Sequence, residues 1–219
     1  MAGLNQYGEG NPVSGIRALV FDLDGTLYVS DGLGHEIEAS AMRHIASVRG
    51  ISCEEATLLV RETRKAIAAR TCRTASLSHA CLELGIDLRE LHLHFVSDIV
   101  PEPFLVRDER VVALLRRLGE RFDLHIYTNN DLPLASRIMD SLGIAGFFRR
   151  IFTIEDSWRP KPDRAVLADI FREIGCEPAQ CFFVGDRYDI DLRLPMELGC
   201  RGFHTRTVDE LLTIETILE

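Results

Sequence analysis

The sequence predicts an α/β protein: a doubly wound parallel sheet of the Rossmann type with a small α-helical cap domain inserted into it. Three observations support this fold class. A short apolar run, Ala18–Phe21, has the length of a buried strand and ends in acidic residues. Between residues 35 and 100 the apolar spacing is helical throughout. After residue 108 strand and helix patterns alternate, which is typical of a parallel sheet with helices on both faces.

The first predicted strand runs directly into Asp22 and Asp24, which are followed by Gly25. Because strand side chains alternate between faces, residues two apart point to the same side, so the two carboxylates are offered together. Ligands of open parallel sheets bind at this carboxyl end of the strands. Two carboxylates so close repel each other, so we expect a divalent cation or a shared proton here. A plain acidic surface turn is the alternative.

The predicted insert begins after this turn. The segment Val29–Gly34 contains two glycines and is expected to be a mobile connection. Ser52 and Glu55 form a capping-box pattern, and Asp87 is placed to cap a last helix before the prolines that follow it. The apolar spacing predicts four helices, over 35–49, 52–70, 77–84 and 87–99. Helices without an intervening strand indicate a separate helical unit, so residues 29–105 are predicted to be the cap.

The remaining chain is predicted to complete the core, which consists of residues 16–28 and 106–219, whereas residues 1–15 are expected to be a loose tail. The predicted strands are 124–127, 150–154, 181–184 and 201–203. The predicted helices are 109–118, 132–142, 163–174, 190–198 and 207–218. All strands are expected to lie in one sheet, because strands that alternate with helices pair in parallel.

Composition and charge narrow the class of protein. The 219 residues carry a formal net charge of −9, which argues against nucleic acid as a partner because a phosphate backbone needs a basic surface. No apolar run approaches the roughly 20 residues of a membrane span, and the N-terminal residues lack the apolar core of a signal peptide. The six cysteines form no CxxC pair and are expected to be reduced thiols, so we expect a cytoplasmic protein.

Polar residues also follow the later predicted strands. Thr128-Asn129-Asn130 comes after the strand 124–127, and Gly185-Asp186 comes after the strand 181–184. Lys161 stands just before a helix, between these two segments. Because the carboxyl ends of parallel strands share one edge of a sheet, we expect these groups to converge with the first acidic pair. Several carboxylates, a hydroxyl and a lysine suit phosphoryl transfer, in which catalysis is mostly positioning and electrostatic stabilisation.

Together these segments resemble the four motifs of the haloacid dehalogenase superfamily of phosphatases. The motifs are Asp22-Leu23-Asp24-Gly25-Thr26, then Thr128, then Lys161, then Gly185-Asp186 with Asp191, in this order along the chain. Each motif alone is a weak signal, whereas the four together are specific. A helical insert between the first two motifs is similar to the superfamily's cap of the first type.

The resemblance implies a role for each of these residues. Asp22 would attack phosphorus and become an aspartyl-phosphate, and Asp24 would act as general acid and then general base. Mg²⁺ would be held by Asp22, Asp186 and the backbone carbonyl of Asp24. The groups implied to contact phosphate are Thr26, Thr128, Asn129 and Lys161. Asp191 would lie behind them, near Lys161 and the metal.

Two departures from the superfamily pattern concern the fourth motif. Arg187 stands where many relatives have a small serine, and Asp189 adds a further acid. Either Asp189 or Asp191 could complete the motif, and the spacing favours Asp191. Outside the motifs, a basic run in the insert could receive an anionic substrate or be an ordinary solvated helix face, and the second interpretation is favoured. This run consists of Arg61, Arg64, Lys65, Arg70 and Arg73.

The resemblance predicts a magnesium-dependent phosphomonoester hydrolase that acts on a small phosphorylated metabolite. A dehalogenase would need neither the acid at residue 24 nor Mg²⁺, whereas a sugar phosphomutase would keep the same motifs and stays an alternative. A phospho-accepting receiver module, from another class, would carry its acceptor aspartate on a different strand from its acidic pair and would lack the insert. The ending Asp24-Gly25-Thr26-Leu27-Tyr28 faintly resembles pyrimidine 5'-nucleotidases. The substrate and the oligomeric state are not predicted.

Overall fold

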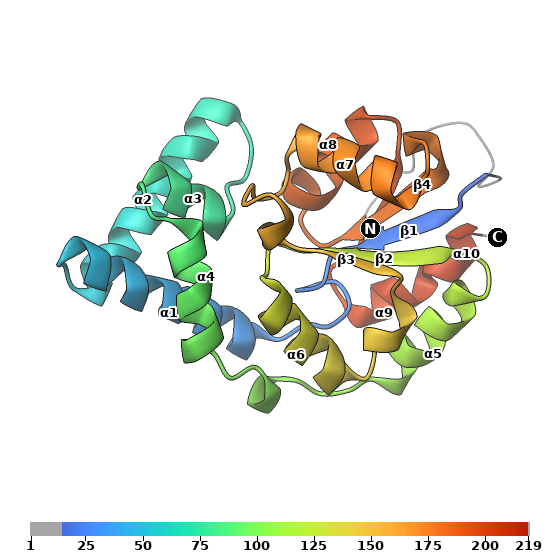
Figure 1. Cartoon of the computed structure of the whole chain (residues 1–219), viewed down its shortest axis with the longest axis horizontal. Helices are drawn as coiled ribbons and strands as arrows, with labels where there is room; N and C mark the ends of the chain where they lie inside the picture. Colours follow the sequence, from blue (N-terminus) through green and yellow to red (C-terminus); the bar gives the residue numbers. More distant parts are fainter. Residues whose placement is uncertain (1–14, 219) are drawn as a thin grey trace, which may run out of the picture.

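The protein, described by a computed structural model over residues 15–218, has a five-stranded sheet with helices on both faces and four helices beside it (Figure 1). The strand order is β3-β2-β1-β4-β5, and every neighbouring pair is parallel. The strands are β1 (Ala18–Phe21), β2 (Asp123–Tyr127), β3 (Arg150–Phe152), β4 (Cys181–Gly185) and β5 (Arg201–His204). The predicted doubly wound α/β fold is confirmed. The predicted tail, residues 1–15, falls almost wholly outside the described residues.

Alternate side chains of the central strand β1 bury against two different layers of helices. Leu19 and Phe21 belong to one hydrophobic cluster, and Ala18 and Val20 belong to the other, as the two-residue period of a strand requires. The first cluster includes residues of α5 (Glu109–Gly119), α6 (Leu132–Leu142), α9 (Val208–Leu211) and α10 (Glu215–Leu218). The second includes residues of α7 (Arg164–Ile174) and α8 (Arg193–Glu197), which lie above the sheet in Figure 1.

Four helices between β1 and α5 form what we call the helical unit: α1 (Asp31–Arg49), α2 (Cys53–Thr71), α3 (Leu77–Glu83) and α4 (Leu88–Asp98). The capping box predicted for α2 is present, since Ser52 Oγ accepts from the Glu55 N–H at 3.2 Å and Glu55 Oε2 accepts from the Ser52 N–H at 2.8 Å. Asp87 caps α4 as predicted. The unit lies beside the carboxyl ends of the strands (Figure 1). Its division from the core at residues 29 and 105 stays a prediction.

The segment Val29–Gly34 differs from its prediction as a mobile connection. Helix α1 begins at Asp31, and Ser30 is its N-cap, with its Oγ accepting from the Leu33 N–H at 3.2 Å. Gly32 and Gly34 therefore lie in the first turn of a helix. The capping hydroxyl of Ser30 offsets the poor helix propensity of the glycines. A prediction made from the glycine content alone misses this cap.

Three predicted elements differ from the bounds or the helix type expected. The strand predicted over 150–154 stops at Phe152, because the Thr153 N–H donates to Asp156 Oδ2 at 2.7 Å and opens a short 3₁₀ turn. The helix predicted over 207–218 consists of α9, a 3₁₀ turn at Leu212–Ile214, and α10. The helix predicted over 190–198 begins with a π-helical turn, Tyr188–Leu192, and continues as α8.

A buried polar pair joins the helical unit to the core. His92 of α4 and Asp131, the N-cap of α6, are both almost fully buried, and His92 Nδ1 lies 2.9 Å from Asp131 Oδ2. The other carboxylate oxygen of Asp131 accepts from the Leu134 N–H at 2.8 Å. Asp131 thus caps one helix and partners a histidine of another.

We expect Asp131→Ala to lower the free energy of unfolding by about 2–4 kcal/mol, because it removes a helix cap and leaves His92 buried without its partner. Asp131→Asn keeps a capping oxygen and a polar group opposite the imidazole, so it should lower the free energy of unfolding by clearly less. Urea denaturation followed by circular dichroism measures both. A loss below about 0.5 kcal/mol for Asp131→Ala would show that the pair does not hold the unit to the core.

Candidate active site

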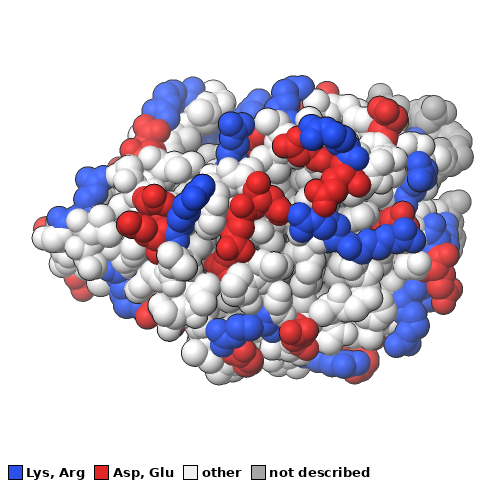
Figure 2. Space-filling view, in the orientation of Figure 1, with Lys and Arg blue, Asp and Glu red and all other residues white. Residues whose placement is uncertain are grey.

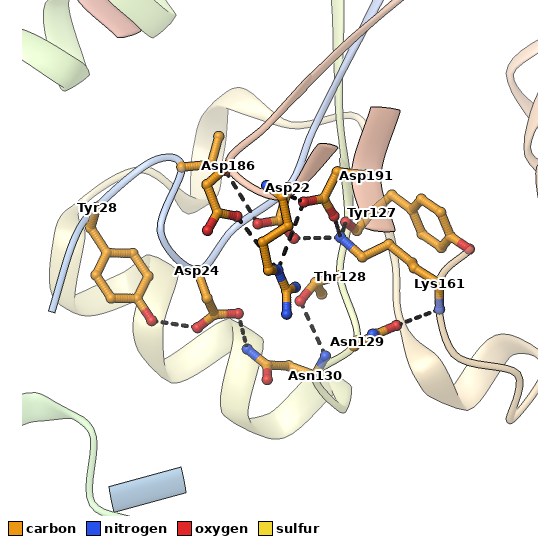
Figure 3. Close-up of polar contacts among 12 residues, drawn as sticks. Asp22, Asp24, Tyr28, Tyr127, Thr128, Asn129, Asn130, Lys161, Asp186 and Asp191 are labelled. Carbon is orange, nitrogen blue, oxygen red and sulfur yellow. Dashed lines mark hydrogen bonds and ion pairs between the residues drawn. The ribbon is translucent and has the colours of Figure 1, made fainter. Parts of the chain in front are cut away.

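A buried lysine, Lys161, lies among acidic side chains at the carboxyl edge of the sheet (Figure 3). Its Nζ donates to Asp22 Oδ1 at 2.5 Å, to Asp191 Oδ1 at 2.6 Å and to the Tyr127 carbonyl oxygen at 2.9 Å. Burial lowers the pKa of Lys161, but Asp191 and Asp22 raise it by more, so the ammonium group stays charged. Three acceptors hold the ammonium group in place, and it in turn fixes the two carboxylates.

The sheet brings the predicted site residues together because they follow the ends of its strands. Asp22 follows β1, and its N–H donates to the Val184 carbonyl oxygen of β4 at 2.8 Å. Thr128 follows β2, Asp186 follows β4, and Lys161 lies in the segment between β3 and α7. The expected convergence at one edge of the sheet is therefore present.

Asp24 is held by two hydrogen bonds that lie on the other side of the turn from Lys161. Tyr28 Oη donates to its Oδ1 at 2.5 Å, and Asn130 Nδ2 donates to its Oδ2 at 2.8 Å (Figure 3). Burial raises the pKa of Asp24 and outweighs these two hydrogen bonds, which lower it. Asp24 is thus a positioned carboxyl group with a pKa above that of an ordinary aspartate, which suits a general acid.

Three carboxylates lie close enough to share a cation. One oxygen each of Asp22, Asp186 and Asp191 lies within 4.8 Å of the others. Both oxygens of Asp191 are already engaged, one by Lys161 and the other by the Arg187 N–H at 3.0 Å. Asp186 Oδ1, in contrast, is buried without a hydrogen-bond partner. An acceptor left without a donor beside a second carboxylate fits a hard divalent cation such as Mg²⁺.

The backbone at Gly25 leaves room for this arrangement. Its φ is +84°, and a Cβ built there would lie 2.7 Å from Asp186 Oδ2. Only glycine combines a left-handed backbone with so close an approach. Gly25 therefore serves both to turn the chain after Asp24 and to let Asp186 lie against the turn.

The structure distinguishes the two acids of the fourth motif. Asp191 is buried beside Lys161, whereas Asp189 Oδ2 accepts from the N–H and the Oγ1 of Thr74 at 2.8 and 3.0 Å. Arg193 pairs with the other oxygen of Asp189 at 2.6 Å. Asp191 thus faces the site, as the spacing favours, and Asp189 instead contacts the helical unit.

Burial destabilises the charged form of Asp22. Burial raises the pKa of its carboxyl from 3.8 to about 7, with Asp191 adding to the increase and Lys161 opposing it. Burial is thus the main cause of the raised pKa, and the cations of Lys161 and Arg187 offset it only in part. A bound divalent cation would further favour the ionised form of this carboxyl group.

The residues predicted to contact phosphate lie at different depths. Thr26 and Thr128 are fully buried: Thr26 Oγ1 donates to Asp22 Oδ2 at 3.2 Å, and Thr128 Oγ1 accepts from the Asn130 N–H at 3.1 Å. Asn129 lines the cavity, and its Oδ1 accepts from the Lys161 N–H at 2.8 Å. Their contacts with phosphate stay predictions.

A cavity of about 460 Å³ opens in front of these groups, between the core and the helical unit. The core contributes Asp22, Asp24 and Asp186 to its wall. The helical unit contributes a mixed wall of apolar side chains, hydroxyls, two imidazoles and charged groups: Ile37, Leu77, Phe95, Ser76, Ser78, His35, His92, Asp31, Glu38 and Arg64. The cavity is thus large enough for more than a phosphate group, and the wall from the helical unit includes the paired charges of Arg64 and Glu38.

The basic run of the insert is mostly an ion-paired surface. Arg61 and Lys65 pair with Glu62, and Arg70 pairs with Glu83. Of the five basic residues of the run, Arg64 alone lines the cavity, and its guanidinium group lies 2.9 Å from Glu38 Oε1. On the face drawn in Figure 2, basic side chains are interspersed with acidic ones. No helix within residues 15–218 combines the length and apolarity needed to cross a bilayer.

The sequence did not indicate how Asp24 is held. Tyr28 and Asn130 reach it from the end of the first motif and from the residue after Asn129. Tyr28 lies four residues after Asp24, a spacing that the sharp turn at Gly25 converts into a contact. Asn130 is part of a polar run after β2, and its nearness to Asp24 depends on the pairing of β1 with β2.

Comparison with known proteins agrees with this geometry. The family model of haloacid dehalogenase-like hydrolases matches residues 16–194. A phosphoglycolate phosphatase from Yersinia pseudotuberculosis is 26% identical over 189 residues, which cover 84% of this chain and 78% of the relative. A glyceraldehyde 3-phosphate phosphatase from Methanopyrus kandleri is 25% identical over 194 residues, covering 81% and 78%.

Solved structures share the fold. A haloacid dehalogenase-type hydrolase from Bacillus subtilis, solved with magnesium, superposes with a TM-score of 0.59. It is 21% identical in sequence, and the match covers 92% of this chain and 99% of that one. At this identity the likeness supports the architecture of core and helical unit.

The raised pKa of Asp22 has a consequence for stability that can be measured without metal. Because the folded protein keeps this proton up to about pH 7 while the unfolded chain releases it near pH 4, stability should fall as pH rises across this window. In excess chelator, Asp22→Asn should therefore show a weaker decline in melting temperature from pH 4 to pH 7. Asp169→Asn, which removes an exposed carboxylate, is the control. Equal pH dependence of all three proteins would contradict the raised pKa of Asp22.

Proposed function

The chain belongs to the haloacid dehalogenase-like hydrolase family, and we propose that it is a magnesium-dependent phosphatase of small phosphorylated metabolites. One observation carries this proposal. Asp22 accepts a hydrogen bond from the Lys161 ammonium group. Asp24, two residues later at the wall of the same cavity, accepts hydrogen bonds from Tyr28 and Asn130. Two carboxyl groups in such different surroundings can divide the tasks of nucleophile and proton donor.

In the first half-reaction Asp22 acts as the nucleophile. One of its carboxylate oxygens forms a bond to phosphorus while the bond between phosphorus and the ester oxygen breaks, which gives an aspartyl-phosphate. Asp24 gives its proton to the departing oxygen, so an alcohol leaves. Lys161 and Thr128 hold the phosphoryl oxygens, and Asn129 and Thr26 support them from the cavity wall and from behind Asp22.

In the second half-reaction water replaces the alcohol. Asp24, now ionised, takes a proton from a water molecule whose oxygen attacks phosphorus. The bond between phosphorus and the Asp22 oxygen breaks, inorganic phosphate forms, and both aspartates return to their starting states. The buried Asp191 positions Lys161 through both steps, because the ammonium group donates to it as well as to Asp22.

Mg²⁺ would be held by Asp22, Asp186 and the backbone carbonyl of Asp24. The buried Asp186 Oδ1, which has no hydrogen bond, and the closeness of the Asp22, Asp186 and Asp191 carboxylates support this set. When bound, the cation would offset the charge of the phosphoryl oxygens and of the carboxylates. The remaining work of binding, orientation and proton transfer belongs to the side chains described above.

The substrate class follows from the cavity and from the relatives. The similar proteins are named for phosphates of glycolate and glyceraldehyde, both small molecules. The cavity of about 460 Å³ has room for a leaving group of this kind or somewhat larger. A sugar phosphomutase of the same superfamily would transfer the phosphoryl group back to a sugar. Release of inorganic phosphate is the property that distinguishes the two. The cytoplasmic location stays a prediction.

Hydrolysis of p-nitrophenyl phosphate by the purified protein should require Mg²⁺, because the carboxylates around Asp22 need a cation before a phosphate dianion can approach. Excess EDTA should abolish phosphate release, and added Mg²⁺ should restore it. A panel of phosphorylated metabolites, assayed for inorganic phosphate, then ranks the substrates. Undiminished hydrolysis in excess chelator would contradict the magnesium requirement.

Two isosteric variants separate the roles of the aspartates. Asp22→Asn should form no phosphoenzyme. Asp24→Asn should lose about 10²–10⁴-fold in turnover, but with p-nitrophenyl phosphate, whose leaving group needs no proton, it should accumulate phosphoenzyme that water hydrolyses slowly. Rapid quench in acid followed by detection of the acyl-phosphate is the measurement. Acyl-phosphate on Asp22→Asn together with its absence on Asp24→Asn would reverse the two roles.

A further inference from the structure

An arginine lies among the carboxylates of the site at a position where the superfamily pattern does not require one. Arg187 Nε lies 3.7 Å from Asp186 Oδ1 and 3.9 Å from Asp191 Oδ2, distances of ion pairs without a hydrogen bond. The backbone N–H of Arg187 donates to Asp191 Oδ2 at 3.0 Å, which fixes the position from which the side chain begins. Arg187 also lines the cavity, and about two fifths of its side chain is exposed.

The charge around Arg187 is strongly negative. Burial lowers its pKa, but the carboxylates of four aspartates raise it by more. These are Asp191, Asp22, Asp186 and Asp24. Against the four carboxylates stand the cations of Lys161 and Arg187, so the site keeps an excess of two negative charges when all groups are ionised. A divalent cation offsets that excess, and an added phosphate dianion restores it.

We propose that Arg187 is a built-in counter-ion that couples cation binding to phosphate binding: it weakens binding of the divalent cation alone and strengthens binding of the phosphate group that follows. This inference rests on the proposed function, since it concerns the same cation and the same phosphoryl group. It assigns a binding task to the residue at which the fourth motif departs from the superfamily pattern.

The two effects have opposite signs for one electrostatic reason. The guanidinium group is next to Asp186, so a cation that approaches this carboxylate meets a like charge. A phosphate dianion meets an attractive charge at the same place, and an exposed planar guanidinium can bind phosphate oxygens through two N–H groups. Arg187 does not close the cation site, because Asp186 Oδ1 keeps no hydrogen bond to it.

Two other arginines, one at the cavity and one near Arg187 in sequence, are less suited to this task. Arg64 is paired with Glu38 on the side of the helical unit. Arg193 is near in sequence, but it pairs with Asp189, which faces the helical unit and not the acidic cluster. Arg193 is therefore a matched control: its loss removes one positive charge from the same segment without changing the carboxylates of the site.

The test compares Arg187→Met, Arg187→Lys and Arg193→Met with the unaltered protein by isothermal titration calorimetry. Mg²⁺ is titrated into protein freed of metal by chelation, and inorganic phosphate is titrated at saturating Mg²⁺. For Arg187→Met we expect the Kd of Mg²⁺ to fall about tenfold and the Kd of phosphate to rise about tenfold, each corresponding to about 1.4 kcal/mol. Arg187→Lys keeps the charge, so its Kd of Mg²⁺ should stay close to that of the unaltered protein, whereas its Kd of phosphate should lie between those of the unaltered protein and Arg187→Met, because lysine lacks the paired N–H groups. Arg193→Met should match the unaltered protein in both titrations.

Opposite shifts for the two ligands cannot arise from partial unfolding, which would weaken both. The coupling role is wrong if Arg187→Met weakens the binding of both ligands or changes the Kd of neither. It is also wrong if the Kd values shift no more than they do in Arg193→Met. If the unaltered protein neither binds Mg²⁺ nor releases phosphate from an ester, the proposed function itself is wrong and this inference falls with it. If the unaltered protein does both and the shifts are absent, only the inference falls.

Discussion

The contact of the Lys161 ammonium group with Asp22 and Asp191 is the interaction on which the site depends. All three charged groups are nearly inaccessible to water, and taking charges out of water costs several kcal/mol per ion unless the partners are close and hydrogen-bonded. Distances of 2.5 and 2.6 Å, together with the Tyr127 carbonyl oxygen, meet that condition for the lysine. They do not meet it for Asp22, whose pKa stays raised. The arrangement is therefore stable in itself yet short of positive charge, which is the state that a cation-dependent phosphate site needs.

As at Gly25, the backbone at Gly185 of the fourth motif lies so close to a site carboxylate that it keeps Lys161, Asp22 and Asp191 close together. A Cβ on Gly185 would lie 2.4 Å from Asp191 Cβ, so any larger residue would push Asp191 away from Lys161. The same carboxylate also accepts from the Arg187 N–H. The π-helical turn that begins at Tyr188 contains Asp191 and directs it back toward the strand it follows. Local backbone geometry and the buried ion contacts thus depend on each other.

The sequence predicts those parts of the molecule whose signals are local. Strand ends carrying acids, the box of Ser52 with Glu55, and the placement of Asp191 by spacing all follow from residues close together in the chain. Prediction from the sequence fails where a contact joins distant segments. It also fails where one capping residue outweighs the low helix propensity of the residues around it. Ser30 turns a glycine-rich stretch into a helix start, and Asn130 reaches Asp24 only because β1 pairs with β2. Asp189 contacts Thr74 across more than a hundred residues, a pairing that no periodicity reveals.

The contact of Asp189 with Thr74 also shows how the helical unit and the acidic cluster are related. Asp189 and Asp191 lie on one short turn, one facing Thr74 in the loop between α2 and α3 and the other facing Lys161. On the opposite side of the cavity, His92 of the unit meets Asp131, three residues after Thr128. The two strand-end segments that carry Thr128 and Asp191 therefore also carry a contact to the helical unit. Any displacement of the unit that opens the cavity must break or stretch these contacts. The positions of Asp191 and Thr128 are thereby linked to whether the cavity is closed.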